Sequence, residues 1–103
     1  MSTSEAKKLC HTPTPGKAPT RIPAWKYDLL RARILALVPL AEPGLAASAL
    51  PDLVAQQLDD DARDRLGSVG WHVTTVRLNM EVEGELVRLP KVKPLHLIRG
   101  AAA

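Results

Sequence analysis

The chain has 103 residues, a formal net charge of +3 and one cysteine. This length suits one domain with one core, and no apolar run approaches the roughly 20 residues that span a bilayer. A membrane span and an internal disulfide are therefore excluded, and the absence of an apolar stretch after the first lysines leads us to expect a cytoplasmic protein without a secretory signal.

The charge is unevenly distributed along the chain. Residues 1–38 hold seven Lys/Arg and two acids, residues 42–66 hold six acids and two arginines, and residues 85–103 hold four bases and one acid. Basic ends around an acidic middle favour contact with phosphate at the two ends, although solvated charged surfaces would give the same pattern.

The first 22 residues are rich in proline, serine, threonine and lysine. Such a composition does not bury enough surface to fold alone, so residues 1–22 are predicted to form an arm that is flexible unless it docks on the domain. The domain itself is predicted over residues 23–100, with a short tail at residues 101–103.

Two helices are predicted in the first half of the domain. The segment "PAWKYDLLRARILALV" opens with a proline and carries one apolar stripe at helical spacing. The segment "GLAASALPDLVAQQL" is predicted to hold a very short strand at residues 44–46 and a second helix, which Ser48 would cap and in which Pro51 and Asp52 would lie in the first turn. The segment "DDDARDR" is expected to be a polar connection with at most one helical turn.

The third helix is predicted over residues 68–83, where Ser68 suits the N-cap and Gly84 the left-handed residue after the end. Its core face should be Val69, Val73, Val76 and Met80, spaced four, three and four residues apart. The alternating segments "ELVRL" and "LHLIR", joined by "PKVKP", predict a two-stranded wing over residues 85–99. Val73, Val76 and Met80 are expected to share one core with Ile34, Leu53 and Leu86.

The stretch "VRLNMEVEGELVRLP" resembles the end of a recognition helix running into the wing of bacterial regulators, with Met80 four residues before Gly84 and then Leu86, Val87 and Arg88. Together with "HTPTPGK", "KYDLLRARIL" and "GSVGWHVTTVRLNMEVEGE", the chain resembles a family of small uncharacterised bacterial proteins with a winged-helix-like fold over most of residues 10–99. The resemblance implies an α+β winged helix-turn-helix with three helices and a small antiparallel wing. The resemblance says little about function, because this scaffold serves both DNA binding and protein contacts.

Double-stranded DNA is the first candidate partner. In a winged helix the third helix enters the major groove and the wing touches the backbone, where arginine and asparagine read bases and lysine meets phosphate. The candidate contacts are His72, Thr75, Arg77 and Asn79 on the helix and Arg88, Lys91 and Lys93 on the wing.

A second apolar stripe favours a protein interface instead. Trp71, Leu78 and Val82 lie roughly opposite the core face. Acids also oppose DNA contact: Glu81 and Glu83 on the helix itself, and Asp59, Asp60, Asp61 and Asp64 in the connection that leads to it. We expect this outer face to be covered by the arm, through residues such as Ile22 and the prolines, or by a second copy of the chain. The alternative function is therefore a protein interaction or homodimerisation module.

Neither a metal site nor catalysis is expected. Cys10 and His11 are adjacent, and the other two histidines are too distant in sequence to give a zinc spacing. The aspartates from residue 59 onward lack the glycine and glutamate of a calcium loop, and no phosphate-binding loop is present. The sequence thus predicts a non-enzymatic winged-helix protein of regulator type, without cofactor, membrane contact or small-molecule substrate.

Overall fold

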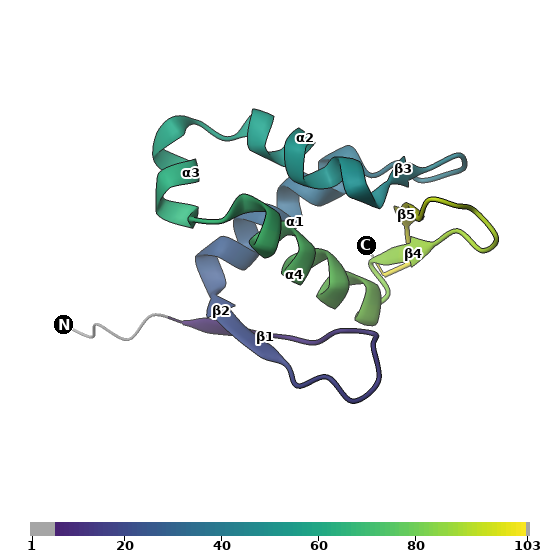
Figure 1. Cartoon of the computed structure of the whole chain (residues 1–103), viewed down its shortest axis with the longest axis horizontal. Helices are drawn as coiled ribbons and strands as arrows, with labels where there is room; N and C mark the ends of the chain where they lie inside the picture. Colours follow the sequence, from purple (N-terminus) through teal and green to yellow (C-terminus); the bar gives the residue numbers. More distant parts are fainter. Residues whose placement is uncertain (1–5, 103) are drawn as a thin grey trace.

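The computed structural model describes residues 6–102 of the chain (Figure 1). Within these residues it has an α+β fold with four α-helices and two small antiparallel sheets. The helices are α1 (Ala24–Leu37), α2 (Leu50–Gln57), α3 (Asp60–Leu66) and α4 (Val69–Val82), with a short 3-10 helix (Ala47–Ala49) before α2. The strands are β1 (Lys7–Cys10), β2 (Thr20–Pro23), β3 (Leu45–Ala46), β4 (Leu86–Arg88) and β5 (His96–Arg99).

The expected number of three helices is wrong, because the acidic connection forms a helix of its own, α3. Asp59 caps it, since its carboxylate accepts a hydrogen bond from the Ala62 amide at 2.8 Å. Its first turn carries aspartates and its last turn arginines, the order that the helix dipole favours. Leu66 is buried and fixes the end of α3 to the core.

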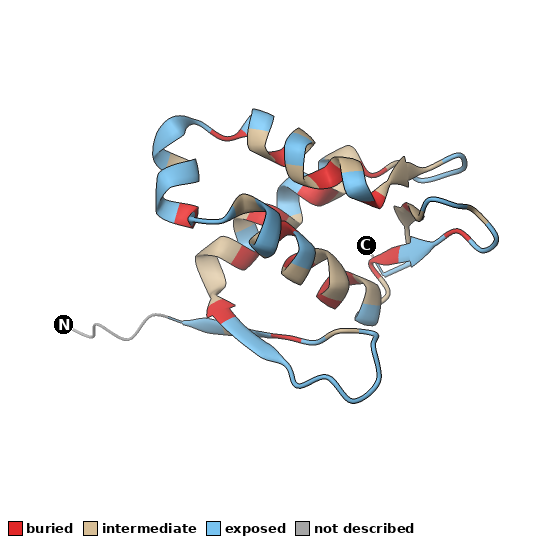
Figure 2. Cartoon of the chain, in the orientation of Figure 1, coloured by how far each residue is buried: buried red, intermediate tan, exposed pale blue. Residues whose placement is uncertain are grey.

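The core lies between α1, α2 and α4, whose inward sides are buried (Figure 2). Ile34, Val73, Val76, Met80 and Leu86 are all buried in one cluster, as predicted. The exception among the predicted core residues is Leu53, which is half-buried and outside that cluster. The eight residues of α2 turn Leu50 and Val54 inward instead.

The start of α2 also differs from the expectation. Ser48 is not the N-cap, because it lies inside the preceding 3-10 helix and α2 begins at Leu50 without a side-chain cap. Pro51 and Asp52 do lie in the first turn, as predicted.

The limits of α4 agree with the predicted third helix. The Ser68 hydroxyl accepts a hydrogen bond from the Trp71 amide at 3.2 Å, which caps the first turn. After the last turn Gly84 has a φ of +81°, a conformation in which a side chain would be strained. No helix within residues 6–102 is long and apolar enough to cross a membrane.

The C-terminal strands pair as predicted, and they also include the short strand before α2. The sheet order is β3-β5-β4, so the last strand lies between the other two. Leu97 pairs with Leu45 on one side and with Arg88 on the other. We call β4, β5 and the loop that joins them the wing.

Residues 7–23 form an antiparallel hairpin of β1 and β2, which lies below α4 in Figure 1. Cys10 and Ile22 are buried in the core, whereas Pro13 and Pro15 are exposed in the connecting loop. The hairpin contacts α1 and α4, so the predicted arm docks on the domain from residue 7 onward. Residues 1–5 of that arm and residue 103 of the tail lie outside the described residues.

Candidate functional site

Asn79 joins α4 to α1 and to the N-terminal hairpin. Its side chain is fully buried. Oδ1 accepts a hydrogen bond from the His11 backbone N–H at 2.8 Å, and Nδ2 donates to the Tyr27 hydroxyl at 2.8 Å and to a Glu83 carboxylate oxygen at 2.7 Å. This burial excludes the predicted contact between Asn79 and a base. The amide holds the hairpin in place instead.

Glu83 forms a second link between α4 and the hairpin. Its Oε2 also accepts a hydrogen bond from the Lys8 ammonium at 3.0 Å. The hydrogen bond from Asn79 and then the one from Lys8 lower the pKa of Glu83 below its ordinary value of 4.5, and the same bond raises the pKa of Lys8 above 10.5. Both side chains are more than one-third exposed, so this pair stabilises the fold only slightly, but it fixes the position of β1 on α4.

The acids Glu81 and Glu85 are paired with arginines from several elements. The Glu81 carboxylate is paired with Arg77 of α4, at 2.6 Å, and with Arg88 of β4, and its side chain is only 6% exposed. Glu85 accepts from the Arg31 Nε at 2.8 Å. Because Glu83 is paired as well, the two carboxylates at the end of α4 that argued against DNA contact are both neutralised by neighbouring bases. The same pairing means that Arg77, whose side chain is 14% exposed, is not a free cation. The acids of α3 are different, because Asp61 and Asp64 are exposed and form no salt bridge within residues 6–102.

Thr75 lies on the side of α4 that faces the hairpin, whereas the contacts of His72 are with the first turn of its own helix. The His72 Nδ1 is 2.7 Å from the Ser68 carbonyl oxygen, and its ring meets the Trp71 ring edge-on at 4.9 Å between centroids. Both His72 and Thr75 are half-buried. Their polar atoms are therefore only partly available to a macromolecule.

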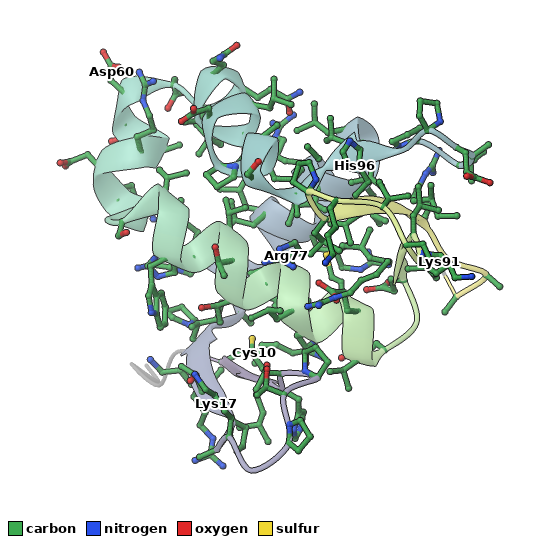
Figure 3. The ribbon with its side chains drawn as sticks, turned by 45° about the vertical axis from the view of Figure 1, so that its right-hand side comes forward. Cys10, Lys17, Asp60, Arg77, Lys91 and His96 are labelled. Carbon is green, nitrogen blue, oxygen red and sulfur yellow. The ribbon has the colours of Figure 1, made fainter. Side chains whose placement is uncertain are left out.

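The wing carries bases that remain open. Lys91 and Lys93 are exposed in the loop between β4 and β5, and in residues 6–102 neither has a carboxylate within salt-bridge distance. On the hairpin, Lys17 and Arg21 are exposed in the same way. Lys17 and Lys91 flank α4 from two sides in Figure 3.

The hairpin loop partly covers the predicted apolar stripe on α4. Leu78 is half-buried and borders a pocket of about 270 Å³ beneath this loop, together with Trp71. Trp71 and Val82 are still 50% and 46% exposed, so the cover is incomplete. The pocket is lined by Cys10, His11, Thr12, Thr14, Lys17, Ala18 and Thr20 of the hairpin and by Trp71, Thr74, Thr75 and Leu78 of α4.

The sequence did not indicate this pocket or the role of Asn79. The only sequence signals for the hairpin are the short segments at residues 7–10 and 20–23. Segments this short predict a hairpin only if the surface of α4 that covers them is known. Tyr27 belongs to the apolar stripe that the sequence predicts on the first helix, and it is buried, but its hydroxyl also accepts a hydrogen bond from Asn79.

Cys10 offers little chemical reactivity. Its thiol is 3% exposed, and burial raises its pKa above the ordinary value of 9.0. His11 beside it is exposed, and the described part of the chain has no group of three or more potential metal ligands.

Comparison with known proteins places the chain in a family without assigning it an activity. No curated protein and no solved structure matches the sequence significantly. The model of one protein family, described as a family of unknown function (DUF6958), matches residues 7–97, which include the hairpin, α4 and most of the wing. The chain therefore belongs to DUF6958.

Proposed function

We propose that the protein is a non-enzymatic, cytoplasmic winged-helix protein that binds double-stranded DNA mainly through phosphate contacts. The order of the elements supports this fold assignment. Helix α1, strand β3, helices α2 and α4 and strands β4 and β5 follow one another as in a winged helix, and β5 lies between β3 and β4. Helix α3 is then an addition in the connection before the recognition helix, α4.

The observation that carries the proposal is the distribution of paired and unpaired charges around α4. The carboxylates at its C-terminal end are paired with bases, whereas Lys17 and Arg21 on one side and Lys91 and Lys93 on the other are exposed and unpaired within residues 6–102. DNA lying along α4 would meet open cations on both sides of the helix, and such contacts supply most of non-specific affinity.

Sequence preference should be weak. Asn79 is buried, Arg77 reaches a base only by leaving Glu81, and His72 and Thr75 are half-buried. Base readout requires side chains that reach the groove edges, so the binding we propose depends on phosphate much more than on bases.

The test is fluorescence anisotropy of a labelled random duplex across a salt series. Each phosphate contact contributes about −0.9 to the slope of log K against log salt. The change of Lys91 and Lys93 together to alanine should weaken binding equally on all sequences and flatten the slope by up to about two. The matched control changes Arg33 and Arg65 to alanine, which removes the same charge from α1 and α3.

Two results would contradict the proposal. Absence of binding at about 50 mM salt, where such contacts are strong, would exclude DNA as a partner. Equal effects of the wing variant and the control variant would show that binding follows net charge and not the surface around α4.

A homodimer through Trp71, Leu78 and Val82 is the second candidate function. The half exposure of Trp71 and Val82 favours it, because an apolar surface of this kind is a common place for a partner. Sedimentation at several concentrations, with Trp71→Ala as the disrupting variant, distinguishes it. A monomer at all concentrations would exclude this function.

A further inference from the structure

We propose that the pocket between the hairpin loop and α4 binds a small organic carboxylate with a flat apolar body. The proposal concerns binding without reaction, and it does not depend on whether the protein binds DNA. It adds a ligand that the sequence did not predict.

The pocket is formed by two segments far apart in the sequence. Its lining comes from residues 10–20 of the hairpin and residues 71–78 of α4, and the Asn79 side chain fixes the hairpin backbone next to it, at His11. Its volume of about 270 Å³ is just below the roughly 300–1,000 Å³ of sites for drug-sized molecules. The space therefore suits a small ligand.

The charges around the pocket favour an anion. Lys17 lines it, and none of the described residues that line it is an acid. Residues 6–22 contain four bases and no acid in sequence. The carboxylate that approaches the hairpin, Glu83, already accepts hydrogen bonds from Lys8 and Asn79. A cationic ligand would thus find no carboxylate in the lining, whereas an anion would find the Lys17 ammonium.

Threonines line both walls of the pocket. Thr74 and Thr75 come from α4, and Thr12, Thr14 and Thr20 come from the hairpin. The Thr12 Oγ1 accepts a hydrogen bond from the Thr14 amide at 3.3 Å, so its own hydroxyl proton stays available for donation. Hydroxyl donors beside an ammonium are suited to the two oxygens of a carboxylate.

The remaining wall is apolar, and it indicates which group the ligand carries besides its carboxylate. Trp71 and Leu78 line the α4 side, and half of the Trp71 surface is exposed to solvent. An inorganic anion would leave this aromatic surface uncovered, whereas a flat apolar body would bury it. Together the two walls favour a carboxylate attached to a ring over an inorganic anion or an amine.

The test is an NMR titration of the full chain, labelled with ¹⁵N, with benzoate. The expected result is a saturable shift of the Trp71 indole and of the Thr74 and Thr75 amides, while the Trp25 indole stays unchanged. The Kd should be in the millimolar range, as for other very small ligands. Benzylamine has the same ring with the opposite charge, and inorganic phosphate is an anion without an apolar body. Neither should give a saturable shift.

Two variants test the residues. Lys17→Glu should weaken benzoate binding about tenfold or more, since it replaces a charge-assisted contact by repulsion. Lys7→Glu makes the same charge change on β1, outside the pocket lining, and should leave the Kd unchanged. Amide spectra of both variants report whether the fold is intact.

Several results would overturn the proposal. These are the absence of saturable shifts with benzoate, binding of benzylamine as tight as that of benzoate, and equal effects of Lys17→Glu and Lys7→Glu. Binding of phosphate as tight as that of benzoate would overturn the apolar part of the ligand, because Trp71 and Leu78 would then contribute nothing.

Discussion

Replacement of Asn79 by alanine should destabilise the domain much more than replacement of a polar residue on the surface. The change removes three hydrogen bonds from a fully buried amide. Those with the His11 amide and the Tyr27 hydroxyl are neutral and contribute about 1 kcal/mol each, and the one with the partly exposed Glu83 contributes somewhat more. The free energy of unfolding should therefore fall by about 3–4 kcal/mol. Since 1 kcal/mol corresponds to about 4–8 °C in a domain of this size, the melting temperature should fall by roughly 12–30 °C.

Urea unfolding followed by circular dichroism measures this change. Thr74→Ala is the matched control, because it removes a polar side chain from an exposed position of the same helix and should change stability by less than about 0.5 kcal/mol. Hydrogen exchange of the hairpin amides, above all that of His11, should accelerate in Asn79→Ala before the helices lose protection.

Asn79→Asp sharpens the test, because it keeps the shape of the side chain but removes the amide donors. At neutral pH it places a buried carboxylate beside Glu83, so its deficit relative to the parent should be larger than at a pH where the new acid is protonated. A loss below about 1 kcal/mol for Asn79→Ala would refute the reasoning that this amide holds the hairpin on the domain.

Three further predictions concern other parts of the fold. Val76→Asp places an unpaired charge in the core and should unfold the domain, whereas Val87→Asp on the exposed side of β4 should not; a Val76→Asp protein that melts within a few degrees of the parent would contradict the core assignment. The pKa of Glu83 is lowered, so its contribution to stability is present above about pH 4.5 and lost as the pH falls through its folded pKa. The Glu83→Gln variant should therefore lose less stability than the parent between pH 6 and about pH 3.5. Equal losses in the two proteins would show that Glu83 does not cause the loss of stability in acid. Because burial raises the pKa of Cys10 and covers its thiol, iodoacetamide should modify it much more slowly in the native protein than in urea, and equal rates in the two states would show that the thiol is open.

The parts of the fold that the sequence predicted well have local signals. The limits of α4 follow from a serine that can cap its first turn and a glycine that can take a positive φ after its last. The wing strands follow from alternating apolar residues on either side of a turn. Both kinds of signal depend only on neighbours within a few residues, so they are visible in a single sequence.

The parts that were missed depend on distant partners or on weak periodicity. α3 has one fully buried apolar residue, Leu66, and its stability comes from capping and charge order rather than from an apolar stripe. The strands of the hairpin are four residues long, and a pair of this size is marginal unless another surface covers it. That surface is provided by α1 and α4, which no local pattern in residues 7–23 reveals.

The candidate site was only partly predictable for the same reason. A polar residue at the edge of a core face, such as Asn79, has the same spacing whether it points to solvent or to another element. The pairing of Glu81 and Glu83 with Arg88 and Lys8 was also hidden, because these bases lie on other elements. Charge counts along one helix therefore overestimated the acidity of the surface around α4.

The docking of the hairpin on α4 has a consequence for the order of folding during synthesis. The His11 amide is 68 residues from its partner Asn79, and Lys8 is 75 residues from Glu83. At about 5–20 residues per second, the ribosome adds these partners roughly 3–12 seconds after the hairpin has been made. During that interval the apolar side of the hairpin, with Cys10 and Ile22, has no helix α4 to cover it. The hairpin, which is made before α4, is thus expected to reach its native position only after α4 has been made, and a chaperone that acts on this chain would meet residues 7–23 in their uncovered form.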